Sequence, residues 1–397
     1  MSSPPSDNLS SRQFSVFVFS KPSSTTIPTM ANDPVRCLEF FSGIGGLHYA
    51  LNIAKIHATV IEAFDVNMIA NEVYEYNFKH KPSNKTIERL TAKDIDKFHA
   101  DCWLLSPPCQ PYTQGGKMQD IDDSRAQGLV HLIKLLPKLE HPPKYMFLEN
   151  VKNFEESQSR ALLVEELSQM GYEIKECLLS PLQFGIPNHR LRYYMMARRI
   201  SQEKQEYTNP LYTQWPFTTS DLSISVPELT NFIQDGADVD MQYRVPEKDI
   251  VKRDRFRFDI VRPCDNRTSC ITKAYGSHHL QTSGSLVQTQ KMDHIDYDWN
   301  DPESLLELGL RFLTPVEIAR LHAFPTQEYQ LQSRNSASAS KVEPRPFTPP
   351  SCHPHLDFPD TVSRMQRYRL LGNSLNCWVV AELLRCELFE PDSIQVE

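Results

Sequence analysis

Apolar and polar side chains follow two distinct periods along the chain from residue 37 onward. The short runs 37–41, 58–64, 102–105 and 145–148 are rich in apolar residues, which is typical of buried strands in a parallel sheet. Between these runs, apolar residues recur every three or four positions, as on one face of a helix. Three such faces comprise Leu47, Ala50, Leu51 and Ala54; Ile69, Val73 and Tyr76; and Leu129, Leu132, Ile133, Leu136 and Leu139.

The alternation of strands and helices predicts an α/β fold with a doubly wound, mostly parallel, Rossmann-like sheet over residues 34–200. The pattern weakens over 201–305, where prolines interrupt it, and we interpret this stretch as a second, smaller domain. Periodicity returns at 306–330 and 361–397, which are predicted to complete the first domain. Residues 331–360 are rich in Ser, Ala and Pro and are interpreted as a flexible insertion.

Composition is typical of a soluble globular protein, with 40% hydrophobic and 23% charged residues. A formal net charge of −8 argues against a wholly basic nucleic-acid coat, although local basic patches remain compatible with it. Residues 1–33 are rich in Ser, Pro and Thr and are expected to form a disordered tail. No apolar run reaches the length of a transmembrane helix, so no membrane association is expected.

The cysteines indicate a reduced protein rather than a disulfide framework or a zinc ribbon. There are nine, at irregular spacings and without a Cys-x-x-Cys pair, which favours an intracellular location in the cytoplasm or nucleus. Cys264 and Cys270 are not assigned to a disulfide. Cys352, His353 and His355 lie close together in the proline-rich insertion, and we interpret their spacing as accidental, so no metal is expected.

A glycine-rich turn follows the first predicted strand. Gly43, Gly45 and Gly46 lie between that strand and a helix, where backbone N–H groups meet nucleotide-like ligands. A dinucleotide fingerprint requires glycine where His48 stands, so NAD is disfavoured. Asp65 ends the next strand, at the place where a carboxylate binds ribose hydroxyls. The alternative is a tight turn with a purely structural role.

Two reactive side chains follow neighbouring predicted strands. Cys109 comes after 102–105 and two prolines, which end the strand and restrict the loop. The carboxyl ends of parallel strands are where open α/β sheets bind ligands. Glu149 follows the run 145–148 and would lie beside Cys109 if the two strand ends share one crevice. The alternatives are a small residue in a turn and a carboxylate that caps a helix.

Basic residues form two groups that are candidates for contacts with a substrate. Arg190 and Arg192 are two positions apart, so both point to one side of an extended segment and could bind a phosphate or a base oxygen. Lys252, Arg253 and Arg255 form a second group that could contact nucleic-acid phosphates. The alternatives are a solvated edge for the first group and a solvated charged face for the second.

The glycine turn, Cys109, Glu149 and the Arg190–Arg192 pair belong to six motifs through which the chain resembles the cytosine carbon-5 methyltransferases that use S-adenosylmethionine. The motifs occur in that family's order at 40–46, 106–110, 149–151, 190–192, 312–325 and 371–376. Further motifs resemble the branch that methylates tRNA, namely 111–113, 149–155, 269–276 and 366–369. The chain departs from that branch at Tyr112 and Ile271, where Phe is usual, and in a longer insertion before Gln366. Because Ile271 lacks a ring that could stack on a base, the resemblance is weaker in the second domain.

The resemblance implies a reaction and a set of catalytic residues. Carbon 5 of cytosine is a poor nucleophile, and addition of the Cys109 thiolate at carbon 6 would activate it. Glu149 would protonate or hydrogen-bond ring nitrogen 3, provided that burial raises its pKa. Arg192, with Arg190, would hold the base oxygen or a flanking phosphate. The base that removes the carbon 5 proton is not identified.

The resemblance also assigns binding residues and domain roles. Residues 34–200 would be the catalytic, cofactor-binding domain and 201–305 the target-recognition domain. S-adenosylmethionine would contact Ile44, Gly45, Gly46, Asp65, Ile87, Glu88, Ser106, Asn373 and Ser374. The nucleic acid would contact Lys252, Arg253, Arg255, Cys270, Thr272 and Lys273.

The substrate that the resemblance implies is a tRNA. The expected target is aspartate tRNA, at the cytosine two positions 3′ of the anticodon. Because bases of an anticodon loop are already partly unstacked, the target would enter the site at a low cost. Two alternatives stay open: a DNA cytosine-5 methyltransferase, and a catalytically weak relative that only binds RNA.

Overall fold

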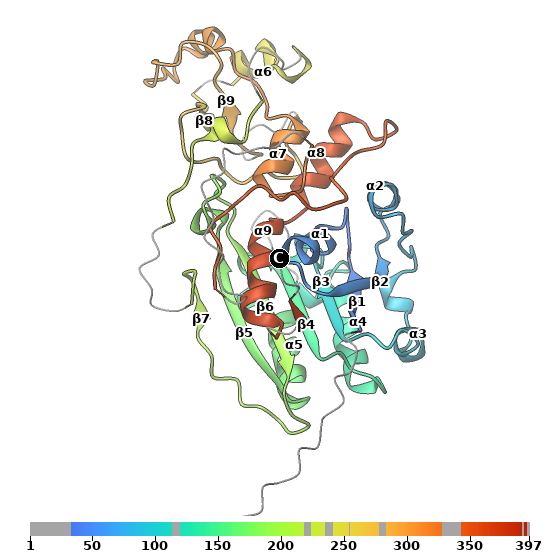
Figure 1. The fold of residues 1–397 in the computed structure, drawn as a ribbon. Helices are drawn as coiled ribbons and strands as arrows, with labels where there is room; N and C mark the ends of the chain where they lie inside the picture. The colour runs from blue at the N-terminus through green and yellow to red at the C-terminus, as the bar shows by residue number, and fades with distance from the viewer. Residues whose placement is uncertain are drawn as a thin grey trace, which may run out of the picture. The chain divides into compact units, whose positions relative to one another are not determined.

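A seven-stranded sheet with strand order β2-β1-β3-β4-β6-β5-β7 forms the centre of the fold (Figure 1). The structure is a computed structural model that describes residues 33–112, 120–217, 224–234, 241–253, 255–277, 283–327, 343–390 and 393–394. The predicted tail therefore lies outside the described residues, apart from Asp33. The strands are β1 (Val35–Phe40), β2 (Ala58–Phe64), β3 (Cys102–Leu105), β4 (Tyr145–Val151), β5 (Tyr172–Leu179), β6 (Arg192–Arg199) and β7 (Leu211–Tyr212).

The sheet is mostly parallel. Strands β2, β1, β3 and β4 are parallel neighbours, and β6 runs antiparallel to both β4 and β5. Every residue of β3 is buried, as expected for a central strand with helices on both faces. The predicted α/β, doubly wound, mostly parallel fold is confirmed.

Helices cover both faces of the sheet. Cys37 of β1 belongs to the core shared with α1 (Gly46–Ala54), α2 (Met68–Phe78) and α9 (Cys377–Leu383). The next residue, Leu38, points to the opposite face and belongs to the core shared with α3 (Ala92–Asp96), α4 (Gln127–Leu135) and α5 (Gln158–Gln169). Helix α9 packs against α1, so the C-terminal part of the chain completes the layer that the N-terminal part begins.

One predicted helical face needs correction. Tyr76 of α2 was expected on the apolar face, but its side chain is 48% exposed. Tyr74 is buried instead, and its hydroxyl donates a hydrogen bond of 2.9 Å to Glu39 of β1. Helix α2 is therefore oriented so that the hydroxyl of Tyr74, rather than the side chain of Tyr76, faces the core and contacts the buried carboxylate of Glu39.

The second half of the chain forms short helices and strands and contains a buried ion pair. They are α6 (Glu247–Val251), α7 (Pro315–Leu321), α8 (Arg364–Gly372) and a two-stranded sheet of β8 (Ile260–Val261) and β9 (Leu286–Val287). Buried Arg311 binds both carboxylate oxygens of Glu317, at 2.8 and 2.9 Å. The described residues from 34 onward group as one compact unit. No helix of the described residues is both long enough and apolar enough to cross a membrane.

Part of the segment predicted to be a flexible insertion is packed against the fold. Arg345 donates a hydrogen bond of 2.7 Å to Glu382 of α9, and its guanidinium lies over the ring of Trp378. Asp357 and Asn77 of α2 exchange hydrogen bonds through the backbone of Asp357. These contacts account for the order of residues 343–360, whereas 331–342 lie outside the described residues.

Candidate active site

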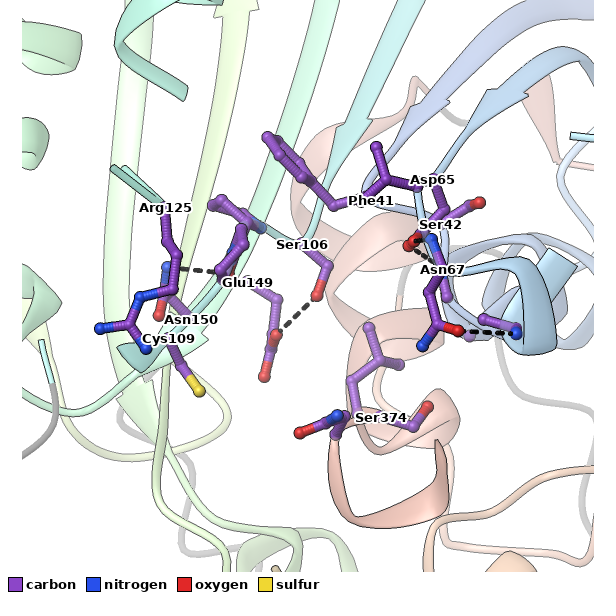
Figure 2. A pocket seen from close by; sticks show the side chains of 18 of the residues that line it. Phe41, Ser42, Asp65, Asn67, Ser106, Cys109, Arg125, Glu149, Asn150 and Ser374 are labelled. Atoms are coloured by element: carbon purple, nitrogen blue, oxygen red, sulfur yellow. Dashed lines mark hydrogen bonds between the residues drawn. The ribbon is translucent and has the colours of Figure 1, made fainter. Parts of the chain in front are cut away.

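A cavity of about 460 Å³ opens at the carboxyl ends of β1, β2, β3 and β4. Its wall contains Ser42 after β1, Asp65 after β2, Cys109 after β3 and Glu149 within β4. Figure 2 shows these side chains around a common space, with Ser374 contributed from beyond α8. The cavity thus occupies the position where open α/β sheets bind ligands, and distant parts of the chain contribute to it.

The glycine turn shapes one side of the cavity. Gly43 and Gly45 have φ angles of +53° and +85°, which favour glycine. A Cβ at Gly45 would lie 2.4 Å from the ring of Phe78. The carboxylate of Asp65 accepts hydrogen bonds of 2.8 Å from the N–H groups of Gly43 and Asn67. The turn therefore presents backbone to the cavity and anchors the carboxylate that was predicted to bind ribose.

The residues present fit an S-adenosylmethionine-sized ligand with polar ends. The Ser42 hydroxyl is buried in the cavity wall, and no described residue serves as its hydrogen-bond partner. A Cβ at Gly43 would meet nothing within 4 Å, so there is open space beside the turn. Most residues predicted to contact the cofactor line the cavity: Ile44, Gly46, Asp65, Ile87, Glu88, Ser106, Asn373 and Ser374. Gly45 does not line it.

Local hydrogen bonds hold the loop that carries Cys109. The amide of Asn150 donates a bond of 3.4 Å to the carbonyl of Pro107, which ties the loop to β4. The backbone N–H of Tyr112 donates to the carbonyl of Cys109, and the Tyr112 hydroxyl donates to Ser159. Burial raises the pKa of the Cys109 thiol, while the positive charge of Arg192 opposes that rise. Ionisation of Cys109 therefore depends on nearby guanidinium groups.

Glu149 is buried between a hydroxyl group and a guanidinium group. The Ser106 hydroxyl donates a hydrogen bond of 3.1 Å to Oε2 of Glu149, as drawn in Figure 2. On the other side, Nε of Arg192 lies 3.5 Å from Oε1. Burial raises the pKa of Glu149, and Arg192 and Arg190 partly offset that rise. A carboxyl group of this kind can carry and release a proton closer to neutral pH than an exposed one.

Arg190 is a buried residue whose two amino groups donate to the protein itself. One amino group donates to the carbonyl of Ile271 at 2.9 Å, and the other donates to the carbonyls of Gly372 and Ser374. The guanidinium lines the cavity yet is only 2% exposed. These bonds join the segment around residue 271 to the segment that follows α8. The placement favours a positioning role over the predicted contact with the base.

The predicted nucleic-acid contacts fall in two places. Thr272 and Lys273 pack against Gly372, where an added Cβ would lie 2.3–2.4 Å from their backbone. Lys273 acts electrostatically on Cys109 and so lies close to the cavity. Lys252, Arg253 and Arg255 follow α6, do not line the cavity, and lie in a part of the fold that Figure 1 draws away from the strand ends.

Cys270 and Ile271, in the motif at 269–276, contact other parts of the protein than the sequence predicted. Ile271 is fully buried, so this position faces the core and an aromatic ring there would not be available for a base. Cys270 accepts hydrogen bonds from the guanidinium groups of Arg190 and Arg192, at 3.5 and 3.6 Å. The thiol is therefore directed toward the two arginines.

The sequence analysis did not identify Arg125 as a pocket residue. It lines the cavity beside Cys109 and Asn150, as Figure 2 shows, and Asp123 binds its guanidinium. The sequence signal that could have identified Arg125 is its pairing with Asp123 directly before a helix. Because Asp-x-Arg pairs are common on protein surfaces, this signal does not by itself indicate a pocket. Within the described part of the chain, no group of three or more His, Cys, Asp or Glu residues could hold a metal ion.

Comparisons with known proteins agree with this geometry. The chain matches the family described as C-5 cytosine-specific DNA methylase over residues 35–385. The tRNA (cytosine(38)-C(5))-methyltransferase of Homo sapiens is 34% identical over 418 residues, covering 89% of this chain and 99% of that protein. A DNA (cytosine-5)-methyltransferase of Dictyostelium discoideum is 32% identical and covers 89% of this chain and 94% of its own. The solved structure of the S. pombe Dnmt2 methyltransferase has a TM-score of 0.68 and 31% identity, covering 89% of this chain and 97% of that chain.

Proposed function

Because the chain belongs to the C-5 cytosine-specific DNA methylase family, we propose that it methylates carbon 5 of a cytosine in tRNA, with S-adenosylmethionine as methyl donor. The proposed target is aspartate tRNA, in the anticodon loop two positions 3′ of the anticodon. A tRNA substrate is supported by the similarity to proteins named tRNA (cytosine(38)-C(5))-methyltransferase over nearly their whole length.

Cys109 is the proposed nucleophile. Its sulfur forms a bond to carbon 6 of the cytosine, and the electron pair of the 5,6 double bond makes carbon 5 nucleophilic. When bound, S-adenosylmethionine would supply an electrophilic methyl group to carbon 5, and its S–CH3 bond would break to leave S-adenosylhomocysteine. Loss of the carbon 5 proton then restores the double bond and expels the sulfur. Burial raises the pKa of the thiol, and the positive charges of Arg192, Lys273 and Arg190 support this role because they oppose that rise.

Glu149 is the proposed acid for ring nitrogen 3. Addition of the thiolate builds negative charge on the ring, which a proton from Glu149 neutralises. Burial raises the pKa of this carboxyl group, so a larger fraction carries the proton near neutral pH. Arg192 lies against the same carboxylate and is placed to hold the base oxygen.

The cofactor residues and the catalytic residues meet in one cavity. Asp65 is the proposed partner of the ribose, and the unpartnered Ser42 hydroxyl is an additional donor or acceptor in the wall. Asn373 and Ser374 would contact the amino-acid end. The single observation that carries the proposal is the convergence of Cys109 and Glu149 on this cavity from two neighbouring parallel strands.

Bisulfite sequencing of aspartate tRNA tests the proposal. Purified protein and S-adenosylmethionine are incubated with an unmodified transcript, and Cys109→Ala serves as the matched control. We expect one protected cytosine, two positions 3′ of the anticodon, with the wild-type protein and none with the variant. An unprotected cytosine with folded wild-type protein would contradict the proposal.

DNA is the second candidate substrate, since one similar protein carries the name DNA (cytosine-5)-methyltransferase. Transfer of labelled methyl groups to tRNA and to duplex DNA, measured side by side, separates the candidates. Greater transfer to DNA would favour the alternative. Full complementation of a deletion strain by Cys109→Ala would instead favour an RNA-binding protein without turnover.

A further inference from the structure

Two buried arginines beside the candidate nucleophile require more negative charge than Glu149 provides. Arg190 is 2% exposed, and the Arg192 side chain is 14% exposed. Both guanidinium groups act on Glu149, but a single carboxylate balances only one of them. Buried charges without partners are costly, so a second anion is expected nearby.

Cys270 is positioned to be that anion. Its sulfur accepts hydrogen bonds from Nη1 of Arg190 at 3.5 Å and from Nη2 of Arg192 at 3.6 Å. Burial opposes ionisation of the thiol, but the two guanidinium groups outweigh burial, so the pKa of Cys270 is lowered. The sulfur thus completes a chain of contacts that runs from Ser106 through Glu149 and Arg192 to Cys270.

The other titratable side chains around the two guanidinium groups are neutral. Burial lowers the pKa of His322 and raises that of Tyr194, so neither carries charge near neutral pH. Lys273 is a further cation that acts on Cys109. Among the described residues that face the arginines, the sources of negative charge are therefore Glu149, Cys270 and, once ionised, Cys109.

We propose that Cys270 is a positioning residue, whose thiolate fixes Arg190 and Arg192 and so maintains the charge balance of the active site during the reaction. The proposal rests on the proposed function, in which Glu149 is protonated while Cys109 is a thiolate. In that state two thiolates balance two guanidinium groups. Without Cys270, Arg192 loses one of its anchors and pairs more closely with Glu149.

Substitutions that separate charge from shape test this role. Cys270→Ser removes the charge and keeps the shape, whereas Cys270→Asp keeps a charge. Since a hydrogen bond to a charged group is worth about 1.5–3 kcal/mol, we expect Cys270→Ser to lower kcat about 10- to 100-fold. KM for the tRNA should change little. Cys270→Asp should recover much of the loss, and Cys264→Ser, at an exposed thiol six positions earlier, should match wild type.

The pH profile gives a readout that loss of packing would not move. Removing a negative charge lowers the pKa of neighbouring acids, so the profile of Cys270→Ser should shift to lower pH and that of Cys270→Asp should not. Wild-type kcat and an unshifted profile in Cys270→Ser would overturn the proposal. So would a folded Cys270→Asp that is no more active than Cys270→Ser.

Alkylation of the wild-type protein tests Cys270 independently of any activity. Peptide-resolved modification with iodoacetamide across pH 5–10 reports the ionisation of each thiol. We expect Cys270 to reach half-maximal modification below the value of an ordinary thiol, about 8.5. A midpoint at or above that value would overturn the thiolate assignment. If this midpoint is low while no RNA is methylated, the proposed function fails and the thiolate assignment stands.

Discussion

The hydroxyl of Ser106 donates a 3.1 Å hydrogen bond to Oε2 of Glu149. Family resemblance assigns Ser106 to the cofactor, yet in the structure its hydroxyl orients the candidate acid. Because the bond favours the ionised carboxylate, it opposes the rise in pKa that burial imposes on Glu149. In the proposed mechanism, Ser106 would therefore link the cofactor side of the cavity to the protonation of the cytosine.

Replacement of Ser106 is expected to change the pH dependence of catalysis. Ser106→Ala removes the donor, so the pKa of Glu149 should rise further. The lower bend in the kcat/KM profile should move upward by the same amount. Ser106→Thr keeps the hydroxyl and should leave the bend in place; equal profiles for all three proteins would refute the role.

Glu149→Gln should alter the shape of the same profile. The proposed reaction needs protonated Glu149 and ionised Cys109, and the pKa of the thiol is the higher of the two. In wild type, kcat/KM should rise with pH up to the pKa of Glu149, stay level, and fall above that of Cys109. An amide does not titrate, so the variant should be less active and its rate should keep rising through the level region. A level region retained in Glu149→Gln would contradict the assignment.

A buried carboxylate beneath the glycine turn predicts a pH-dependent stability. Glu39 accepts hydrogen bonds from the Tyr74 hydroxyl and the His48 N–H, and burial raises the pKa of Glu39 to about 8. Between about pH 4.5 and 8, the folded state holds a proton that the unfolded state has released. The free energy of unfolding should therefore fall by up to about 1.4 kcal/mol per pH unit from this group.

The variant Glu39→Gln isolates that contribution. The amide keeps one acceptor oxygen, which replaces the carboxylate oxygen bound by either Tyr74 or His48, and it does not titrate. Denaturant unfolding at pH 5, 6.5 and 8 should show the variant gaining stability relative to wild type as the pH rises. A difference that is constant across the three pH values would show that Glu39 does not change its protonation in this range.

The parallel strands β1 to β4 could be predicted because strands that are buried on both faces consist almost entirely of apolar residues. Every residue of β3 is buried, and six of the seven residues of β4 are buried. Strand β6 was not predicted, because it begins with Arg192 and ends with Arg199 although its centre is fully buried. Its antiparallel insertion between β4 and β5 depends on contacts between distant segments, which local periodicity does not contain.

The same distinction applies to the site. Cys109 and Glu149 were identifiable because Cys109 follows β3 within a few residues and Glu149 lies near the carboxyl end of β4, so local sequence places both at the sheet edge. The hydrogen-bond partners of Arg190 were not identifiable from the sequence, because they are the carbonyl groups of residues 271, 372 and 374, which lie far from Arg190 along the chain. The role of Cys270 depends on the same long-range contacts and on the charge that surrounds it.

The most direct test uses aspartate tRNA that carries 5-fluorocytosine at the proposed target. Fluorine at carbon 5 is not lost as a proton would be, so the sulfur cannot be expelled after methyl transfer. The account predicts a denaturant-stable protein–RNA adduct that requires S-adenosylmethionine and maps to the peptide containing Cys109. An adduct on another cysteine, such as Cys270, or no adduct with active protein, would contradict it.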